Sequence, residues 1–137
     1  MVSSNAKDQI RESAKANSYM KIIRYNITME SIKVESWSAY IEKHPNFTGC
    51  LMNEENNIYW FQNGEYHRED GPACEYSNGN KVWCKHGKYH REDGPAIEWA
   101  DGSKGWYLNG VPYHSEQDYR IALRKIKLEK VLKKIEG

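Results

Sequence analysis

The 137-residue sequence has little phenylalanine and almost no net charge. Its two Phe stand against five Trp and ten Tyr, so nearly every aromatic side chain carries a polar atom. A net charge of +1 provides no overall field that would attract nucleic acid or a membrane surface. No segment has the length and apolarity of a secretory signal or a membrane span. We therefore expect a cytoplasmic protein without a membrane partner.

The sequence also lacks paired cysteines. Its three cysteines, Cys50, Cys74 and Cys84, are an odd number and form no CxxC motif. This usage favours reduced thiols in a cytosol over a disulfide framework. One repeat later, the residues at the places of Cys74 and Cys84 are Ile97 and Tyr107, so we expect these thiols to act as small packing groups.

The sequence contains one motif in two nearly identical copies, EYHREDGPACEY at 65–76 and KYHREDGPAIEW at 88–99. The same spacing of 23 residues separates the tryptophans at 60, 83 and 106 and the glycines at 64, 87 and 110. A degenerate first unit occupies residues 50–64, and the last unit loses the register after one extra residue near Pro112. The sequence therefore predicts three repeat units with a 23-residue period.

Dipeptides that end in glycine recur every seven or eight residues within this region. They are Asn63-Gly64, Asp70-Gly71, Asn78-Gly79, His86-Gly87, Asp93-Gly94, Asp101-Gly102 and Asn109-Gly110. Such pairs supply the positive φ angles of primed hairpin turns. The segments between them alternate apolar and polar residues, which indicates short half-buried strands. Residues 49–114 are thus expected to form an antiparallel β-hairpin repeat sheet whose units bury one another, with caps at both ends.

The flanking segments predict these caps. The alternating apolar pattern of residues 23–29 predicts a strand, and residues 36–44 predict a helix that Pro45 ends. At the other end, Ser115 and Asp118 form a capping-box pattern before a helix over 116–135. Its apolar stripe consists of Tyr119, Leu123, Ile126, Val131 and Ile135, with Leu128 beside it. We predict an α+β fold with an N-terminal α/β element (1–48), a MORN-like β-repeat region (49–114) and a C-terminal amphipathic capping helix (115–137).

The repeated His-Arg-Glu-Asp phrase has a chemical and a structural interpretation. Imidazole and carboxylate groups suit general-base or metal-binding work. Three such groups on one tight turn cannot converge on one ion, so a metal site would need His67 and His90 from two stacked copies. This metal ladder remains the alternative.

In the structural interpretation, a motif needed at every turn of a repeat must recur. Asp70 accepts backbone N–H groups, Gly71 adopts a conformation closed to other residues, and Pro72 fixes φ. Arg68 pairs with carboxylates of the adjacent copy. We expect the motif to be scaffold, with no catalytic residue, metal or cofactor. The repeat-turn residues are His67, Arg68, Glu69, Asp70, Gly71, Pro72, His90, Arg91, Glu92, Asp93, Gly94 and Pro95, and Trp60, Trp83 and Trp106 are expected to form a ladder in the core.

The units NGEYHREDGPACEYSNGNKVW and HGKYHREDGPAIEWADGSKGWYLNG resemble the NGxxHREDGPAxE repeats of many bacteriophage and prophage proteins of unassigned role, which are relatives of MORN-type hairpin repeats. The resemblance covers about residues 58–114. It implies a non-enzymatic viral accessory protein in the host cytoplasm. We expect such a protein to bind a host protein through its repeat sheet or N-terminal element and to inhibit a host defence system.

Two other functions stay open. MORN-type repeats also occur in immunity or antitoxin proteins that bind a cognate toxin. The third candidate is a nucleic-acid-binding module, since residues 115–137 hold seven Lys or Arg against four Asp or Glu. Its basic surface would comprise Arg120, Arg124, Lys127, Lys130 and Lys134. Nucleic acid is the less favoured partner, because residues 58–114 hold six basic against eight acidic residues.

Overall fold

The computed structural model describes residues 19–24, 27–33 and 37–137. Its strands are β1 (Tyr19–Arg24), β2 (Ile27–Lys33), β3 (Gly49–Met52), β4 (Ile58–Gln62), β5 (Glu65–Tyr66), β6 (Cys74–Glu75), β7 (Lys81–Val82), β8 (Cys84–Lys85), β9 (Lys88–Tyr89), β10 (Ile97–Glu98), β11 (Lys104–Leu108) and β12 (Val111–Tyr113). The helices are α2 (Trp37–Lys43) and α3 (Glu116–Glu136). The expected α+β class, with an antiparallel sheet and a C-terminal helix, is confirmed.

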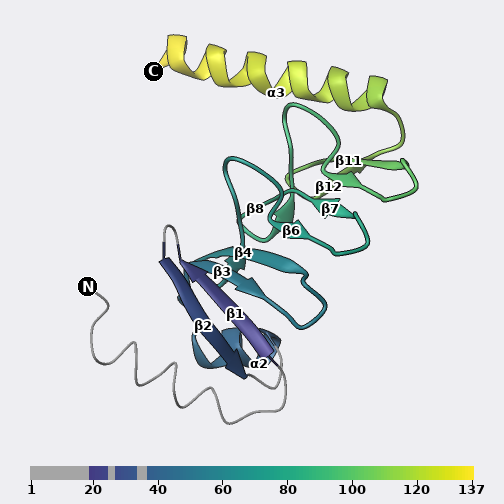
Figure 1. The fold of residues 1–137 in the computed structure, drawn as a ribbon. Coiled ribbons are helices and arrows are strands. Elements are labelled where there is room, and N and C mark those ends of the chain that lie inside the picture. Colours follow the sequence, from purple (N-terminus) through teal and green to yellow (C-terminus); the bar gives the residue numbers. More distant parts are fainter. Residues whose placement is uncertain (1–18, 25–26, 34–36) are drawn as a thin grey trace.

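The sheet follows the chain almost strand by strand. Ten strands lie in the order β12-β11-β10-β7-β6-β4-β3-β1-β2, with β5 paired to β4, and β8 pairs with β9 in a separate two-stranded sheet. Every described pairing is antiparallel. Figure 1 shows the hairpins stacked one after another between β1 and β2 at one end and α3 at the other. Neighbouring hairpins therefore supply the partners that each two-residue strand lacks.

The N-terminal expectations are met in part. The helix expected at 36–44 is present as α2, where the His44 N–H donates to the carbonyl of Tyr40 at 3.0 Å. The single strand expected over 23–29 is wrong in extent, since β1 ends at Arg24 and β2 begins at Ile27. An alternating pattern does not show where a chain reverses, so it merged the end of one strand with the start of the next. The rest of the expected 1–48 element lies outside the described residues.

Primed turns join the strands of three successive hairpins, as three of the seven dipeptides predicted. The other four differ, since only the glycine has positive φ in Asn78-Gly79 and Asp101-Gly102, and Gly71 and Gly94 do not have it. Asn63, His86 and Asn109 have φ of 50°, 50° and 51°, and the glycine after each is also positive. Left-handed backbone at both central positions is the geometry of a type I′ turn, which matches the twist of a hairpin. The regular spacing of these turns in the sequence thus corresponds to regularly placed hairpins.

The core is a row of buried side chains along one face of the stack. It contains Tyr40, Leu51, Tyr59, Phe61, Ala73, Cys74, Val82, Cys84 and Ile97. All three cysteines are free and buried, and burial raises the pKa of the Cys50 thiol to about 11. The tryptophans differ from expectation. Trp60, Trp83 and Trp106 are only half-buried and stand outside this core.

Helix α3 begins as predicted. The Ser115 hydroxyl accepts the Asp118 N–H at 3.1 Å and donates to the Asp118 carboxylate at 2.7 Å. Only Tyr119 of the helix is buried, while Leu123 and Ile126 are half-buried and Val131 and Ile135 are exposed. The helix thus caps the stack with its first turns and extends past it (Figure 1), so the predicted apolar stripe is wrong as a single buried face. No helix among the described residues is both long and apolar enough to cross a bilayer.

Candidate functional site in the two His-Arg-Glu-Asp turns

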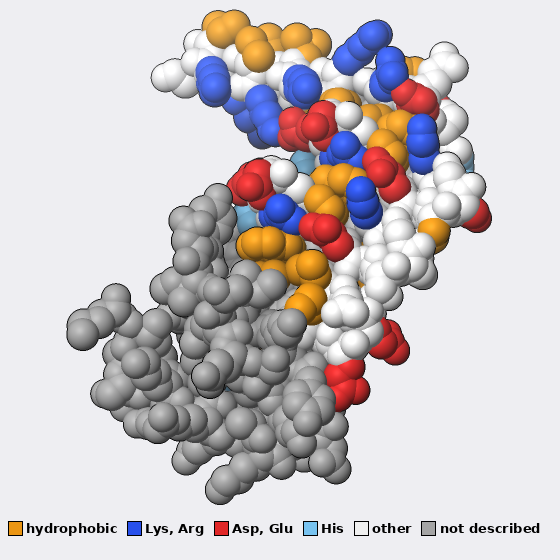
Figure 2. Space-filling model, viewed as in Figure 1, with side chains coloured by type: hydrophobic (Ala, Val, Ile, Leu, Met, Phe, Trp, Pro, Cys, Tyr) orange, Lys and Arg blue, Asp and Glu red, His pale blue; other side chains and the backbone are white. Residues whose placement is uncertain are grey.

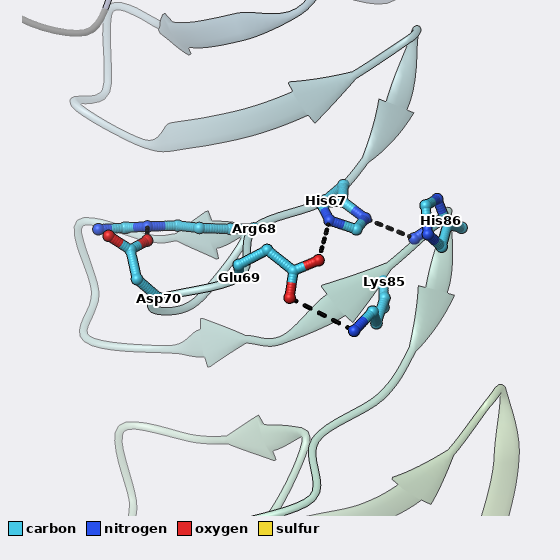
Figure 3. Close-up of polar contacts among 6 residues, drawn as sticks. All are labelled: His67, Arg68, Glu69, Asp70, Lys85 and His86. Atoms are coloured by element: carbon cyan, nitrogen blue, oxygen red, sulfur yellow. Dashed lines mark hydrogen bonds and ion pairs between the residues drawn. The ribbon is translucent and has the colours of Figure 1, made fainter. Parts of the chain in front are cut away.

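The four side chains of the first turn point in two directions. Figure 3 shows His67 and Glu69 directed toward Lys85 and His86 of the next hairpin, while Arg68 and Asp70 lie together on the other side. Consecutive residues of an extended segment alternate in direction, which separates the motif into two pairs. The tetrad does not gather around one point.

His67 uses both of its ring nitrogens. Its Nδ1 accepts the backbone N–H of His86 at 3.0 Å, and its Nε2 lies 2.8 Å from the Glu69 carboxylate. Because Nδ1 is an acceptor, the ring proton sits on Nε2, from which it is donated to Glu69. The side chain is 5% exposed. A buried imidazole with both nitrogens engaged has no lone pair left for a metal or a substrate proton.

His90 repeats this contact one hairpin later. Its Nδ1 accepts the backbone N–H of Asn109 at 3.0 Å, and its Nε2 lies 3.5 Å from Glu92. At the first level of the stack a hydroxyl takes the same place, since Thr48 Oγ1 accepts the Asn63 N–H at 3.0 Å. Each acceptor holds the first residue of the next primed turn. Thr48, His67 and His90 therefore link successive hairpins as side-chain hydrogen-bond acceptors, and we refer to such linking residues as fasteners.

Backbone bonds run beside these fasteners. The N–H groups of Gly87 and Gly110 each donate to a tyrosine carbonyl of the preceding hairpin at 2.9 Å, and Gly64 donates to the Phe47 carbonyl at 2.8 Å. The loop after α2 therefore serves as the first edge of the stack. It approaches so closely that a Cβ on Gly64 would lie 2.0 Å from the Pro45 carbonyl oxygen.

Arg68 lies flat between an indole and a glycine. Its guanidinium carbon is 4.3 Å from the centroid of the Trp60 ring, and a Cβ on Gly71 would approach it to 3.0 Å. Its Nε donates to Asp70 at 2.9 Å, and one terminal nitrogen donates to Glu75 at 2.7 Å. Packing of this kind combines cation–π attraction with charge-assisted hydrogen bonds.

Arg91 makes the same set of contacts in the second turn. It lies 3.8 Å from the Trp83 centroid and donates to Asp93 at 2.7 Å and to Glu98 at 2.8 Å. A Cβ on Gly94 would again come within 3.0 Å of its guanidinium carbon. Both arginines also donate to the carbonyl of the proline four residues on, at 3.2 Å.

These contacts correct three expectations about the turns. Arg68 pairs with carboxylates of its own copy, and the charge contact between copies is made by Lys85 to Glu69 at 3.3 Å. The principal partner of the Asp70 carboxylate is the Arg68 side chain, which was not expected, and a backbone N–H contributes less. Gly71 is not among the positive-φ residues, so the need for glycine is steric. A side chain there would displace the guanidinium from the indole.

The carboxylates of the turns are held in their charged form. The hydrogen bond from His67, followed by the one from Lys85, lowers the pKa of Glu69. The Arg68 and Arg91 side chains lower the pKa of Asp70 and Asp93 in the same way. These groups are therefore engaged anions, and none of them is a proton donor near neutral pH.

Glu92 differs in its surroundings. Partial burial raises its pKa, but the charges of Lys130 and His90 outweigh this effect and the net pKa is lowered. Lys130 of α3 reaches Glu92 at 3.5 Å, so the second turn is linked to the capping helix.

An open groove of about 600 Å³ lies between the two turns. Its walls include Arg68, Glu69, Lys85 and Arg91, which are bonded to one another or to their own turns, and Trp83, whose ring is covered by Arg91. Within the described ranges, no group of three or more His, Cys, Asp or Glu residues has an arrangement that could hold a metal ion. The groove provides a polar surface for contact and no set of unengaged reactive groups.

Sequence reasoning missed a second row of fasteners on the other side of the stack. The side-chain oxygens of Asn57 and Asn80 accept the N–H groups of Ser77 and Ala100, each at 2.8 Å. These two asparagines stand at the repeat spacing, which was the available clue. Tyr119 was also missed. Its ring lies 5.0 Å from Trp106 and its hydroxyl donates to the Arg91 carbonyl at 2.6 Å, so it covers the third indole as arginine covers the first two.

An aromatic patch, consisting of Tyr89, Trp99 and Tyr107, lies at the end of the core row, where Tyr107 packs against the buried cluster. Tyr89 and Trp99 are 44% and 39% exposed, and the rings of Tyr89 and Tyr107 are 5.2 Å apart. Trp99 and Tyr107 both extend over Gly105, where a Cβ would meet each ring at 3.1 Å. The β11–β12 hairpin that follows Tyr89 leaves Tyr89 and Trp99 exposed, and no further hairpin follows it in the described part of the chain.

The basic surface expected on α3 is partly engaged. Arg120 pairs with Glu116 on the same helix, and Lys130 pairs with Glu92. Arg120, Arg124 and Lys127 line a pocket of about 310 Å³ between the helix and the second turn. Lys134 is exposed near the helix end.

None of the family models, curated proteins or solved structures compared with this chain matches it.

Proposed function

We propose that the protein is a non-enzymatic binding protein whose 23-residue units are structural repeats of one hairpin stack. In this proposal it is a phage or prophage accessory protein that acts in the host cytoplasm. It engages a host protein through the aromatic patch of the repeat sheet and thereby inhibits a host defence system.

One observation carries the proposal. The histidines and arginines of the repeated motif are bonded to neighbouring hairpins and to their own turns, whereas the rings of Tyr89 and Trp99 stand exposed. The motif is therefore occupied in holding the stack together. What the stack presents outward is a rigid aromatic surface.

Tyrosine and tryptophan suit such a surface for a physical reason. They bring large flat contact area at a small loss of conformational entropy, and they are enriched at protein interfaces and at their energetic centres. In the patch, the Trp99 and Tyr107 rings both lie against Gly105, and the Tyr107 ring contacts that of Tyr89 at 5.2 Å, so little ordering remains to be done on binding.

Affinity capture tests the proposal. The full chain is immobilised and exposed to bacterial host lysate, and the bound proteins are identified by mass spectrometry. We expect the wild type to retain a stoichiometric defence protein and the Tyr89→Ala/Trp99→Ala variant to lose it. Val111→Ala, which removes an exposed apolar group from β12 instead, is the control and should retain it.

Two results would contradict the proposal. One is capture that survives loss of both rings while circular dichroism shows intact folding. The other is stoichiometric metal bound to the wild-type chain and lost in a His67→Ala/His90→Ala variant, which would return the motif to the metal-ladder hypothesis.

A further inference from the structure

Helix α3 carries apolar residues on two opposite faces. Tyr119, Leu123 and Ile126 face the sheet. The other apolar residues form an outer stripe, which consists of Ile121, Leu128, Val131, Leu132 and Ile135, each between 47% and 75% exposed. Figure 2 shows apolar side chains along the outer edge of α3 toward its C-terminus, with Lys and Arg side chains beside them. No residue in the described part of the chain covers this edge.

The spacing of the outer stripe is that of a helix-pairing seam. Ile121, Leu128 and Ile135 stand seven residues apart, at position a of a heptad, and Val131 stands at position d. Arg124 occupies the other d position, between Ile121 and Leu128. The helix has 21 residues and is therefore about 30 Å long, enough for three heptads.

Basic residues border the seam. In the same heptads, Arg120, Lys127 and Lys134 occupy position g, and Lys125 occupies position e. The helix holds seven basic residues against four acidic ones, a net charge of +3. Of these basic residues, only Arg120 and Lys130 have a carboxylate within ion-pair distance among the described residues. Arg120 is paired with Glu116, and Lys127 lies in the pocket with Glu92, whose pKa its charge lowers. A partner helix would therefore meet unpaired positive charge at Lys125 and Lys134 and at Arg124 within the seam.

This charge pattern opposes pairing with a second copy. An antiparallel pair would bring the three basic g positions of one helix against those of the other, and a parallel pair would place Arg124 against itself. The segment 1–18 of the same chain is also unsuited, since it holds three basic and two acidic residues.

A bilayer is the less suitable partner as well. Helices that lie in a membrane interface present a broad apolar face, often with Trp or Phe, and place their charges away from it. The outer stripe contains no aromatic residue, and Arg124 interrupts it.

We propose that the outer stripe of α3 is a docking surface for an acidic amphipathic helix of another protein. The apolar face of that helix packs along Ile121, Leu128, Val131 and Ile135. Its carboxylates lie against Lys125 and Lys134, and a further carboxylate meets Arg124. This surface is separate from the aromatic patch, so each is tested without the other.

The test uses a fluorescent peptide with leucine at positions a and d and glutamate at e and g. A matching peptide with lysine in place of every glutamate is the charge control. Binding to the full chain is followed by fluorescence anisotropy at low and high salt. The protein variants are Leu128→Glu/Val131→Glu, within the outer stripe, and Lys133→Glu, on the opposite side of the helix. Both change the charge by −2, so they differ in position and not in charge.

We expect the wild type to bind the acidic peptide and not the lysine peptide, with weaker binding at high salt. Leu128→Glu/Val131→Glu should weaken binding by about tenfold or more, and Lys133→Glu by less than about threefold. An equal loss of peptide affinity in both variants would show that binding depends only on the net charge of the protein, and it would overturn the proposal.

Failure of the acidic peptide to bind would also overturn it. Three further results would assign the surface to another occupant, and each would likewise be lost in Leu128→Glu/Val131→Glu. They are a dimer seen by sedimentation velocity, binding to anionic phosphatidylserine vesicles, and binding to a DNA duplex. Circular dichroism verifies that both variants keep their helix content.

Discussion

Replacement of His67 by leucine or asparagine tests the role of the fasteners. Leucine fills the same space but leaves the His86 N–H without its acceptor, which lies 3.0 Å away in the wild type. A buried N–H that loses its partner costs about 1–3 kcal/mol. The imidazole side chain is only 5% exposed, so water does not readily take its place. The Glu69 hydrogen bond is lost too, at a cost of about 0.5–1 kcal/mol because Glu69 is exposed.

His67→Leu should therefore lower the free energy of unfolding by about 1.5–4 kcal/mol. His67→Asn places an amide oxygen close to the position of Nδ1 and can keep the bond to His86, so we expect a loss of about 1–2 kcal/mol, mainly from the smaller buried volume. Urea denaturation followed by circular dichroism measures both. Equal destabilisation by the two variants would refute the fastener argument, because it would show that ring volume matters and the hydrogen bond does not.

Two further predictions concern the same turn. Gly71→Ala places a Cβ 3.0 Å from the Arg68 guanidinium carbon and should lower the free energy of unfolding, measured by urea denaturation, by about 1–2 kcal/mol. In an Arg68→Ala background most of this loss should disappear. An unchanged loss would show that backbone conformation is responsible. Because Glu69 has a lowered pKa in the folded protein, its bonds with His67 and Lys85 stabilise the fold above the ordinary pKa of 4.5 and are lost as the pH falls through the folded value. Glu69→Gln should therefore flatten the decline in stability on the acid side of pH 4.5, and an unaltered pH profile would count against the assigned contacts.

The parts of this structure that were predictable are local. Ser115 and Asp118 mark the start of α3 because a capping residue and the backbone it caps are three positions apart. Asn63-Gly64 and Asn109-Gly110 mark primed turns because few other residue pairs tolerate positive φ at both positions. Between the turns, apolar and polar residues alternate. Side chains of a β-strand also alternate between its two faces, so this pattern predicted short strands.

The errors concern which groups meet across the stack. The repeat spacing predicted that Arg68 pairs with a carboxylate but did not identify which one. Arg68 reaches Glu75 of the same copy because its guanidinium lies flat on the Trp60 ring, and this orientation of the side chain is set by packing. The indole was expected in the core for its apolar area, yet the core row is filled by residues of the opposite strand face, such as Cys74 and Val82. A residue-by-residue pattern contains neither fact.

By itself, the sequence determined the elements: short strands, the turns between them, two helices and the recurrence of one hairpin motif. These follow from backbone preferences that extend over a few residues. Only the tertiary structure decided what the repeated His-Arg-Glu-Asp phrase is for, because the partner of His67 is a backbone N–H nineteen residues away, at His86. The tertiary structure also decided that α3 extends beyond the sheet and leaves its outer stripe exposed. The length of a helix depends on its own residues, whereas the surface that it packs against is formed by residues distant in the sequence.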